Sequence, residues 1–447
     1  MTLKPYPNLL QQPFDYTAYE SERPNQTFYG LPREVCFCKA CVVSNQRPNS
    51  TVETSHTRDS QKKTINFDAE GVCDACRVKE RKAKIDWAER ERELWELCDK
   101  YRSKDGSYDC LVPGSGGKDS FYQAHILKYK FGMNPLTVTW APHIYTDWGR
   151  RNLDHWIHAG FDNILVTPNG LVHRLLTRLA IETIFHPFQP FIVGQKLMPP
   201  KLAAQYGIKL VFYGEDEAEY GNPIADTQSA IRDYKYSSAK TDEELYLSGV
   251  SLADLKNKFG LKQHDLIPYM PTNPEYLIEN GVQVHYLGYY MKWHPQGAYY
   301  YAVEHGGFEA SPERTPGTYS KYTSIDDKMD DFHYYTTFIK FGIGRATHEA
   351  AQETRSGDIT RDEAVALVKR FDGEFPTRFA DELFQYLSIP EKQFPIASKM
   401  FEQPIMDRAY FDAVTDRFRS PHIWQWKDGK WQLRHRVFDA EASSKAA

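Results

Sequence analysis

Six consecutive residues, Ser115 to Ser120, have the types and order needed to hold a chain of phosphates. They follow the apolar run 110–112 and precede a segment with helical spacing, so we expect them to form the turn between a strand and a helix. Such a turn directs backbone N–H groups and the positive end of a helix dipole toward an anion. Gly116 and Gly117 let the backbone approach phosphate oxygens without a Cβ in the way. The sequence therefore predicts a phosphate-binding loop.

The pattern differs from that of the ATPase P-loop, because Lys118 is followed by Asp119 and the position five before Gly117 is Val112. Its spacing instead resembles the PP-loop of ATP pyrophosphatases, which hold the β,γ-pyrophosphate while a substrate oxygen attacks the α-phosphate. Ser115 and Ser120 then offer hydroxyl donors, and Lys118 points at phosphate or at solvent. We assign Asp119 to Mg²⁺, whose oxygen shell combines a carboxylate with phosphates and water. A glycine turn with an ordinary helix cap is the alternative.

Five of the seven cysteines lie within the first 76 residues, and four of them form two Cys-x-x-Cys knuckles. The four are Cys38, Cys41, Cys73 and Cys76. Their spacing is close to that of a four-cysteine zinc ribbon, in which four thiolates hold a structural Zn²⁺ and leave no open position. Cys36 is an alternative ligand, and unliganded knuckles or a redox pair are alternatives to the metal. Cys98 and Cys110 are expected to be small buried side chains.

Strand and helix signals alternate from residue 110 to residue 213, which indicates an α/β fold with a parallel sheet covered on both faces. We expect strands at 110–112, 136–140, 163–166 and 209–213, and helices at 119–131, 150–159 and 171–185. Ligands bind such sheets outside the carboxyl ends of the strands. That rule brings the loop at Ser115, the pair Thr139 and Trp140, and the pair Gly214 and Glu215 to one rim.

The chain divides into four expected regions. Residues 1–35 are rich in Pro and Tyr and form an extended arm, and residues 36–85 form the zinc-ribbon unit. Residues 86–225 form the PP-loop ATP-binding domain, which begins with an amphipathic helix. Residues 226–447 form a mainly helical region for substrate or partners, with an amphipathic helix capped by Thr360.

The composition is that of a soluble globular enzyme with two or three packed units: 447 residues, 41% hydrophobic and 26% charged. A net charge of −5 argues against a dedicated nucleic-acid binder. No run of membrane-spanning length and no signal segment is evident, so we expect a cytoplasmic protein without a membrane partner. The many Tyr and Phe side chains suit sugar or base faces, although a core or a subunit interface uses them as often.

Four stretches carry a family resemblance: the two knuckles with residues 66–73, the Ser115–Ser120 loop, residues 213–221, and residues 339–347. Together they resemble the N-acetyl sugar amidotransferases, the WbpG/PseA-like enzymes of bacterial surface-glycan and flagellar-sugar pathways. The similarity runs from about Cys38 to near the C-terminus. It implies that ATP adenylates the acetamido oxygen of an N-acetyl sugar, expected to be nucleotide-linked, and that ammonia then displaces AMP to leave an acetamidino group.

The resemblance also implies partners. No cysteine follows Cys110 to serve as a glutaminase nucleophile. The resemblance implies that ammonia comes from separate subunits similar to the glutaminase and the cyclase of imidazole glycerol phosphate synthase.

Several polar residues are candidates for this reaction. Glu215 is a candidate to bind the metal or to orient ammonia, with a helix cap as the alternative. Lys340 and Arg345 are candidates to hold phosphate or the charge of the adenylate, with a surface salt bridge as the alternative. Asp326 and Asp327 are candidates to bind Mg²⁺ or sugar hydroxyls.

Two other functions fit parts of the sequence. One is a tRNA-modifying PP-loop enzyme, a thiolase or a lysidine-type synthetase, which the acidic balance and the lack of a cysteine after the loop disfavour. The other is a zinc-ribbon scaffold whose nucleotide site only senses ATP. His143, His186 and His294 lie in aromatic-rich surroundings, where a packed core histidine is expected rather than a catalytic one.

Overall fold

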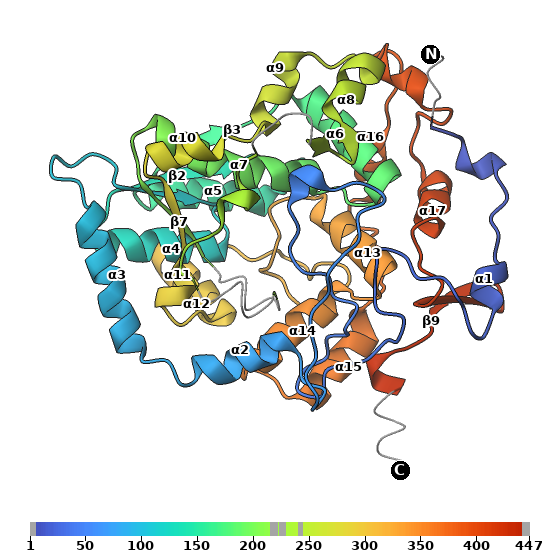
Figure 1. Cartoon of the computed structure of the whole chain (residues 1–447), viewed down its shortest axis with the longest axis horizontal. Coiled ribbons are helices and arrows are strands. Elements are labelled where there is room, and N and C mark those ends of the chain that lie inside the picture. Colours follow the sequence, from blue (N-terminus) through green and yellow to red (C-terminus); the bar gives the residue numbers. More distant parts are fainter. Residues whose placement is uncertain (1–5, 215–221, 223–228, 240–244, 440–447) are drawn as a thin grey trace.

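Five strands form one parallel sheet in the order β3-β2-β1-β4-β7. The structure, a computed structural model, describes residues 6–214, 222, 229–239 and 245–439 (Figure 1). The strands are β1 (Cys110–Pro113), β2 (Pro135–Trp140), β3 (Asp162–Val166), β4 (Leu210–Tyr213) and β7 (Gln283–Tyr286). The predicted α/β fold with a parallel sheet is confirmed. β7 was not predicted, and it joins the sheet from beyond the expected domain boundary at residue 225.

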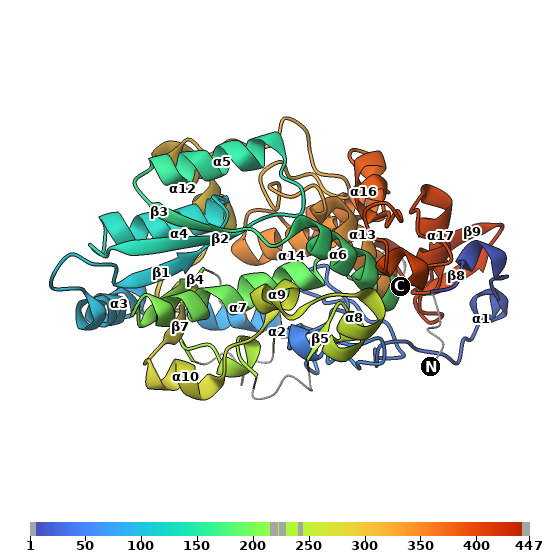
Figure 2. The ribbon, with the colours of Figure 1, turned by 90° about the horizontal axis from the view of Figure 1, so that it is seen from above.

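Helices cover both faces of this sheet (Figure 2). α4 (Lys118–Tyr129) packs on one face beneath α12 (Pro295–Gly306), and α7 (Gln189–Gln205) packs against β1, β2 and β4 on the other. Alternate residues of β1 face the two sides. Cys110 and Val112 share a core with Phe121 of α4, whereas Leu111 lies in the larger core that includes α7. Cys98 joins Cys110 in the first core, and both are fully buried as expected.

The sequence did not predict α7, which runs through Pro199 and Pro200. Prolines remove backbone hydrogen bonds from a helix interior and normally end it. Both prolines are buried, and α7 lies along the sheet beside α6 (Gly170–Ile184). Packing against three strands therefore maintains a helix that its local sequence disfavours.

The remaining elements surround this core. They include α1 (Thr17–Glu20), η2 (Glu53–Ser55), α2 (Asp74–Lys82), α3 (Trp87–Tyr101), α5 (Asp147–His158), β5 (Tyr246–Leu247), β6 (Val250–Ser251), α8 (Leu252–Phe259), α9 (Gln263–Leu266), α10 (Pro274–Glu279) and α11 (Leu287–Tyr290). The C-terminal region adds α13 (Asp330–Phe341), α14 (Arg345–Ser356), α15 (Arg361–Phe371), α16 (Ala380–Leu387), α17 (Arg408–Asp416) and the hairpin of β8 (Trp424–Lys427) and β9 (Lys430–Leu433). α15 begins with the predicted Thr360 cap. In the described part of the chain, no helix is both long and apolar enough to cross a lipid bilayer.

The N-terminal arm lies on the C-terminal region, beside the β8–β9 hairpin (Figure 1). The hydroxyl of Tyr19 donates to the carbonyl of Arg419 at 2.8 Å, and that of Tyr29 donates to the carbonyl of Phe418 at 2.7 Å. Because these contacts join the two ends of the chain, the arm is part of the folded body.

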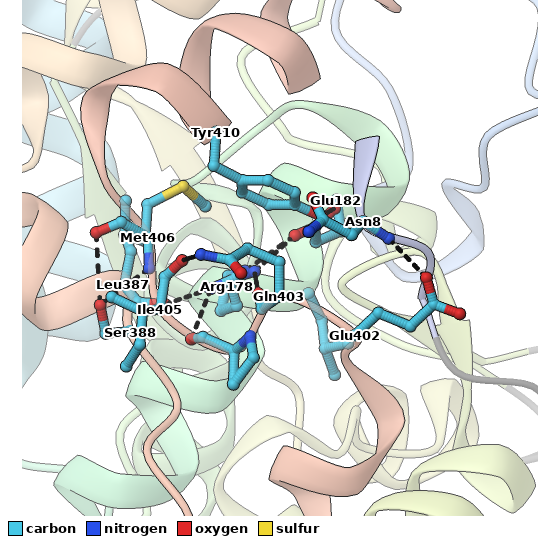
Figure 3. A network of polar contacts seen from close by, with 12 residues as sticks. Asn8, Arg178, Glu182, Leu387, Ser388, Glu402, Gln403, Ile405, Met406 and Tyr410 are labelled. Atoms are coloured by element: carbon cyan, nitrogen blue, oxygen red, sulfur yellow. Dashed lines mark hydrogen bonds and ion pairs between the residues drawn. The ribbon is translucent and has the colours of Figure 1, made fainter. Parts of the chain in front are cut away.

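Arg178 of α6 joins the sheet domain to the C-terminal segment (Figure 3). Its fully buried guanidinium donates to the carbonyls of Leu387, Gln403 and Pro404 at 3.0, 2.7 and 3.1 Å. It also donates to Glu182 at 2.9 Å, and Glu182 accepts a hydrogen bond from Tyr410. The planar guanidinium group has five N–H donors in a fixed arrangement. In this network they hold residues 387–410 against α6.

Candidate active site

The predicted loop turns from β1 into α4. Gly116 has φ +84°, and a Cβ there would lie 2.6 Å from the carbonyl oxygen of Asn152, so only glycine fits. Gly117 is extended and is the N-cap residue of α4. Because glycine offers no capping oxygen, the ordinary Ser or Asp cap is not formed, and the first N–H groups of α4 stay available to an anion.

This loop opens into a pocket of about 370 Å³ beside the carboxyl ends of β1 and β4. The strand order changes direction between these two strands, which is where parallel sheets commonly bind ligands. The predicted binding residues that line the pocket are Ser115, Gly117, Lys118, Asp119, Ser120, Trp140 and Gly214. Gly116 packs against α5 instead. Thr139 is fully buried on the sheet, where its hydroxyl accepts a hydrogen bond from Asn163. Glu215 lies outside the described residues.

The opposite wall of the pocket comes from the C-terminal region. Asp330, His333 and Tyr334 of α13 line it, at positions that share one helix face. Sequence reasoning missed these three residues. The acidic run that includes Asp326 and Asp327 was the only local signal. Aromatic side chains complete the wall, namely Phe188, Phe191, Tyr213, Phe308 and Tyr322.

Asp326 and Asp327 have different surroundings. Asp327 accepts hydrogen bonds from the backbone and the ring of His143, both at 2.7 Å, and from the backbone of Met329 at 3.0 Å. Asp327 therefore links the segment that follows β2, at His143, to the start of α13. Asp326 has a pKa raised by burial and by Asp327, and a hydrogen bond from Ser115 opposes that shift. Asp326 thus faces the Ser115–Ser120 loop directly.

Negative charge dominates the pocket. Asp330 is buried, and burial followed by the charge of Asp326 raises its pKa well above the usual range. Lys118 is buried too, with Nζ 2.6 and 2.7 Å from the carboxylate oxygens of Asp119, so it points neither to solvent nor to free space. A triphosphate would meet several carboxylates and one paired ammonium group. A divalent cation would be needed to offset this charge, and Asp119 and Asp326 offer oxygen ligands of the kind that Mg²⁺ combines with phosphates and water.

Lys340 and Arg345 do not line the pocket. Lys340 is a buried residue of the last turn of α13, and its Nζ donates at 2.8 Å to the carbonyl of Ile184, the last residue of α6. Arg345 is buried as well and donates to Glu349 at 2.9 Å and to the carbonyl of Thr323. The glycines between them end one helix and begin the next, since Gly342 is the left-handed C-cap of α13 and residue 344 is the N-cap of α14.

The four cysteines of the two knuckles form one buried cluster. The Sγ atoms of Cys38 and Cys76 are 3.9 Å apart, and those of Cys41 and Cys73 are 3.8 Å apart. A tetrahedron with Zn–S bonds of about 2.3 Å places sulfur atoms about 3.8 Å apart, so the cluster fits a zinc ion. Cys36 is exposed and lies outside the cluster, which resolves the choice of ligand.

The knuckles are anchored by the C-terminal region. Arg361, the first residue of α15, donates at 3.0 Å to the carbonyl of Cys41 and at 3.1 Å to the carbonyl of Cys38. Lys79 of α2 approaches the carbonyl of Thr354 in α14 at 3.4 Å. A metal in this cluster would therefore stabilise the contact between the two regions as well as the knuckles.

A pocket at the switch point of a parallel sheet, lined by convergent polar groups, is typical of α/β enzymes. Residues 316–437 match the family model described as "LPS biosynthesis protein WbpG-like, C-terminal domain". This part of the chain is therefore similar to the C-terminal domain of WbpG-like proteins, which supports the resemblance inferred from the motifs. The matched segment contains all of α13, and with it the acidic wall of the pocket.

A second similarity is more limited. The chain is 34% identical over 87 residues to an uncharacterized protein of Methanocaldococcus jannaschii. These residues make up 20% of the chain and 30% of that protein, so the match spans less than a third of the relative's length.

Proposed function

We propose that the protein is an ATP-dependent amidotransferase that converts an acetamido group on a sugar into an acetamidino group and forms AMP and pyrophosphate. One observation carries the proposal: the Ser115–Ser120 loop and the acidic face of a WbpG-like domain share a single pocket. The description of the matched family, lipopolysaccharide biosynthesis, supports a sugar-modifying biosynthetic role. A cytoplasmic location and a nucleotide-linked acetamido sugar belong to the same proposal.

The loop would hold the triphosphate. Backbone N–H groups at the start of α4 and the hydroxyls of Ser115 and Ser120 suit the β- and γ-phosphates. Asp119 and Asp326 would hold Mg²⁺ against the same oxygens, which neutralises charge on the departing pyrophosphate. The aromatic side chains of the pocket offer flat faces to a sugar ring, so substrate and nucleotide would meet in one space.

An amide carbon is a weak electrophile, so ammonia does not displace its oxygen without prior activation. The amide oxygen attacks the α-phosphorus and pyrophosphate leaves, so the oxygen becomes part of an AMP leaving group. Ammonia then adds to the carbon, gives up a proton, and AMP departs. Asp330 faces the pocket with a raised pKa, which suits a carboxylate that accepts this proton. Separate glutaminase and cyclase-like subunits would supply the ammonia.

Sulfur transfer to tRNA has no comparable support. No cysteine is among the described residues that line the pocket. The net charge of −5 is likewise unlike that of a tRNA-binding enzyme.

Incubation of the enzyme with ATP, Mg²⁺, ammonium and a UDP-linked acetamido sugar tests the proposal. We expect equal amounts of AMP and pyrophosphate, and mass spectrometry should find a sugar in which an imino group replaces the carbonyl oxygen. The same mixture without ammonium should yield no such sugar. Release of ADP and phosphate would refute the proposed reaction.

A further inference from the structure

Two hydroxyl groups lie side by side in the wall of the pocket. Oγ of Ser324 and the hydroxyl oxygen of Tyr334 are 3.2 Å apart, and both residues line the pocket. Tyr334 belongs to α13, whereas Ser324 belongs to the loop that precedes this helix. Each hydroxyl can donate one hydrogen bond and accept others. These two residues, which we call the hydroxyl pair, therefore retain donor and acceptor capacity for a ligand.

The backbone of Ser324 has an unusual conformation. Its φ of +46° lies in the left-handed region, which few residues other than glycine adopt. Such a conformation persists only where the surrounding contacts maintain it, and it is common at sites that bind ligands. Among the described non-glycine residues with positive φ, Ser324 alone lines the pocket. Its surroundings must therefore supply contacts that fix this turn.

Arg345 supplies such contacts to both members of the hydroxyl pair. Its Nη2 donates to the carbonyl of Thr323, the residue before Ser324. Its guanidinium carbon lies 4.0 Å from the centroid of the Tyr334 ring, in the arrangement by which guanidinium groups stack on aromatic rings. A single side chain therefore fixes the turn that carries one hydroxyl and the ring that carries the other.

Arg345 is itself held in place. Its side chain is 1% exposed, and its Nε donates at 2.9 Å to Glu349, one turn along α14. Glu349 also accepts a hydrogen bond from the hydroxyl of Thr318 at 2.5 Å. Because Arg345 does not line the pocket, it can influence a ligand there only through the residues that it contacts.

We propose that the hydroxyl pair binds the sugar substrate and that Arg345 is a positioning residue for the pair. The inference rests on the proposed amidotransferase function. The hydroxyl and acetamido groups of a sugar both donate and accept hydrogen bonds, so they need partners of both kinds. The carboxylates of Asp326 and Asp330, on the same side of the pocket, accept hydrogen bonds when ionised but do not donate them. The hydroxyl pair provides the neutral donors that this wall otherwise lacks.

Arg345→Lys tests the positioning role, because lysine keeps a positive charge beside Glu349 but loses the fork that reaches Thr323 and the Tyr334 ring. In the assay of AMP formation, we expect the KM for UDP-N-acetylglucosamine to rise about fivefold, the scale of one hydrogen bond. The KM for ATP should not change, because the Ser115–Ser120 loop is unaltered.

Arg378→Lys is the matched control. Arg378 donates to Asp331 of α13 at 2.8 Å, and its guanidinium carbon lies 4.6 Å from the ring centroid of Phe379. It thus resembles Arg345 in having one ionic and one aromatic partner, but it does not line the pocket or contact the hydroxyl pair. Both KM values of this variant should equal those of the wild type.

Tyr334→Phe tests the hydroxyl pair directly, because it keeps the ring beside Arg345 and removes one hydroxyl. We expect a similar rise in the KM for the sugar nucleotide. Arg345→Lys should raise that KM by a smaller factor in the Tyr334→Phe protein than in the wild type, because both changes act on the same hydroxyl. Fully additive effects would show that Arg345 does not act through Tyr334.

The outcomes separate the two proposals. A wild-type KM for the sugar nucleotide in Tyr334→Phe would overturn the hydroxyl pair, and the same result in folded Arg345→Lys would overturn the positioning role. An equal rise in the KM for ATP would also contradict it, since a general structural defect would affect both substrates. Absence of AMP formation by the wild-type enzyme would overturn the proposed function itself. If Arg345→Lys does not fold, Tyr334→Phe still tests the pair, because it removes no buried charge.

Discussion

Asp119→Asn is expected to reduce AMP formation at least about a hundredfold, the scale of effect seen when a group that stabilises transition-state charge is removed. Asp119 lines the same pocket as Asp326 and Asp330, whose carboxylates would repel a triphosphate unless Mg²⁺ lay between them. Asparagine keeps the size of the side chain and one acceptor oxygen for Lys118 but loses the charge that binds the metal. Turnover measured at saturating ATP, over a range of Mg²⁺ concentrations, gives the result.

Asp147→Asn is the matched control, because Asp147 is an exposed aspartate in the first turn of the neighbouring helix α5 and does not line the pocket. Its turnover should equal that of the wild type. Thermal unfolding of both variants is needed as well, since Lys118 is buried and loses its ionic partner in Asp119→Asn. Wild-type turnover in a folded Asp119→Asn protein would contradict the assignment of Asp119 to the metal.

Cys73→Ser is expected to lower the zinc content and the free energy of unfolding together. Structural zinc binding is part of the folding free energy and amounts to about 10–16 kcal/mol in isolated zinc-finger peptides. This larger chain has other contacts to retain its fold, so we expect a loss on the order of several kcal/mol. Metal analysis by mass spectrometry and chemical denaturation of the same samples measure the two quantities.

Cys36→Ser provides the comparison, because Cys36 is exposed and lies two residues from a ligand without joining the cluster. Its zinc content and stability should match those of the wild type. Full stability of the wild-type chain after complete removal of zinc would show that the cluster does not need a metal.

The parts of the fold that depend on local sequence were predictable. The loop at Ser115 was recognised because strand, glycines and helix follow one another directly, and the cysteine knuckles were recognised because metal geometry restricts ligand spacing. The helix capped by Thr360 was likewise found from its own residues.

The parts that depend on distant contacts were not predictable. Packing on three strands overrides Pro199 and Pro200 in α7, and β7 is a short segment that pairs with a strand about 70 residues earlier. Lys340 and Arg345 have residue types suited to phosphate, but Lys340 is buried against the carbonyl of Ile184 in α6, and Arg345 pairs with Glu349 one turn along its own helix. His186 stacks on the ring of His333, in agreement with the expected packed histidine.

The central claim is that the backbone turn after β1 holds the tail of ATP. A crystal structure of the protein with Mg²⁺ and a non-hydrolysable ATP analogue tests it most directly. We expect the β- and γ-phosphates within hydrogen-bonding distance of the N–H groups that begin α4, with Mg²⁺ beside Asp119. Phosphates bound elsewhere, or a protein that binds no nucleotide, would contradict the account.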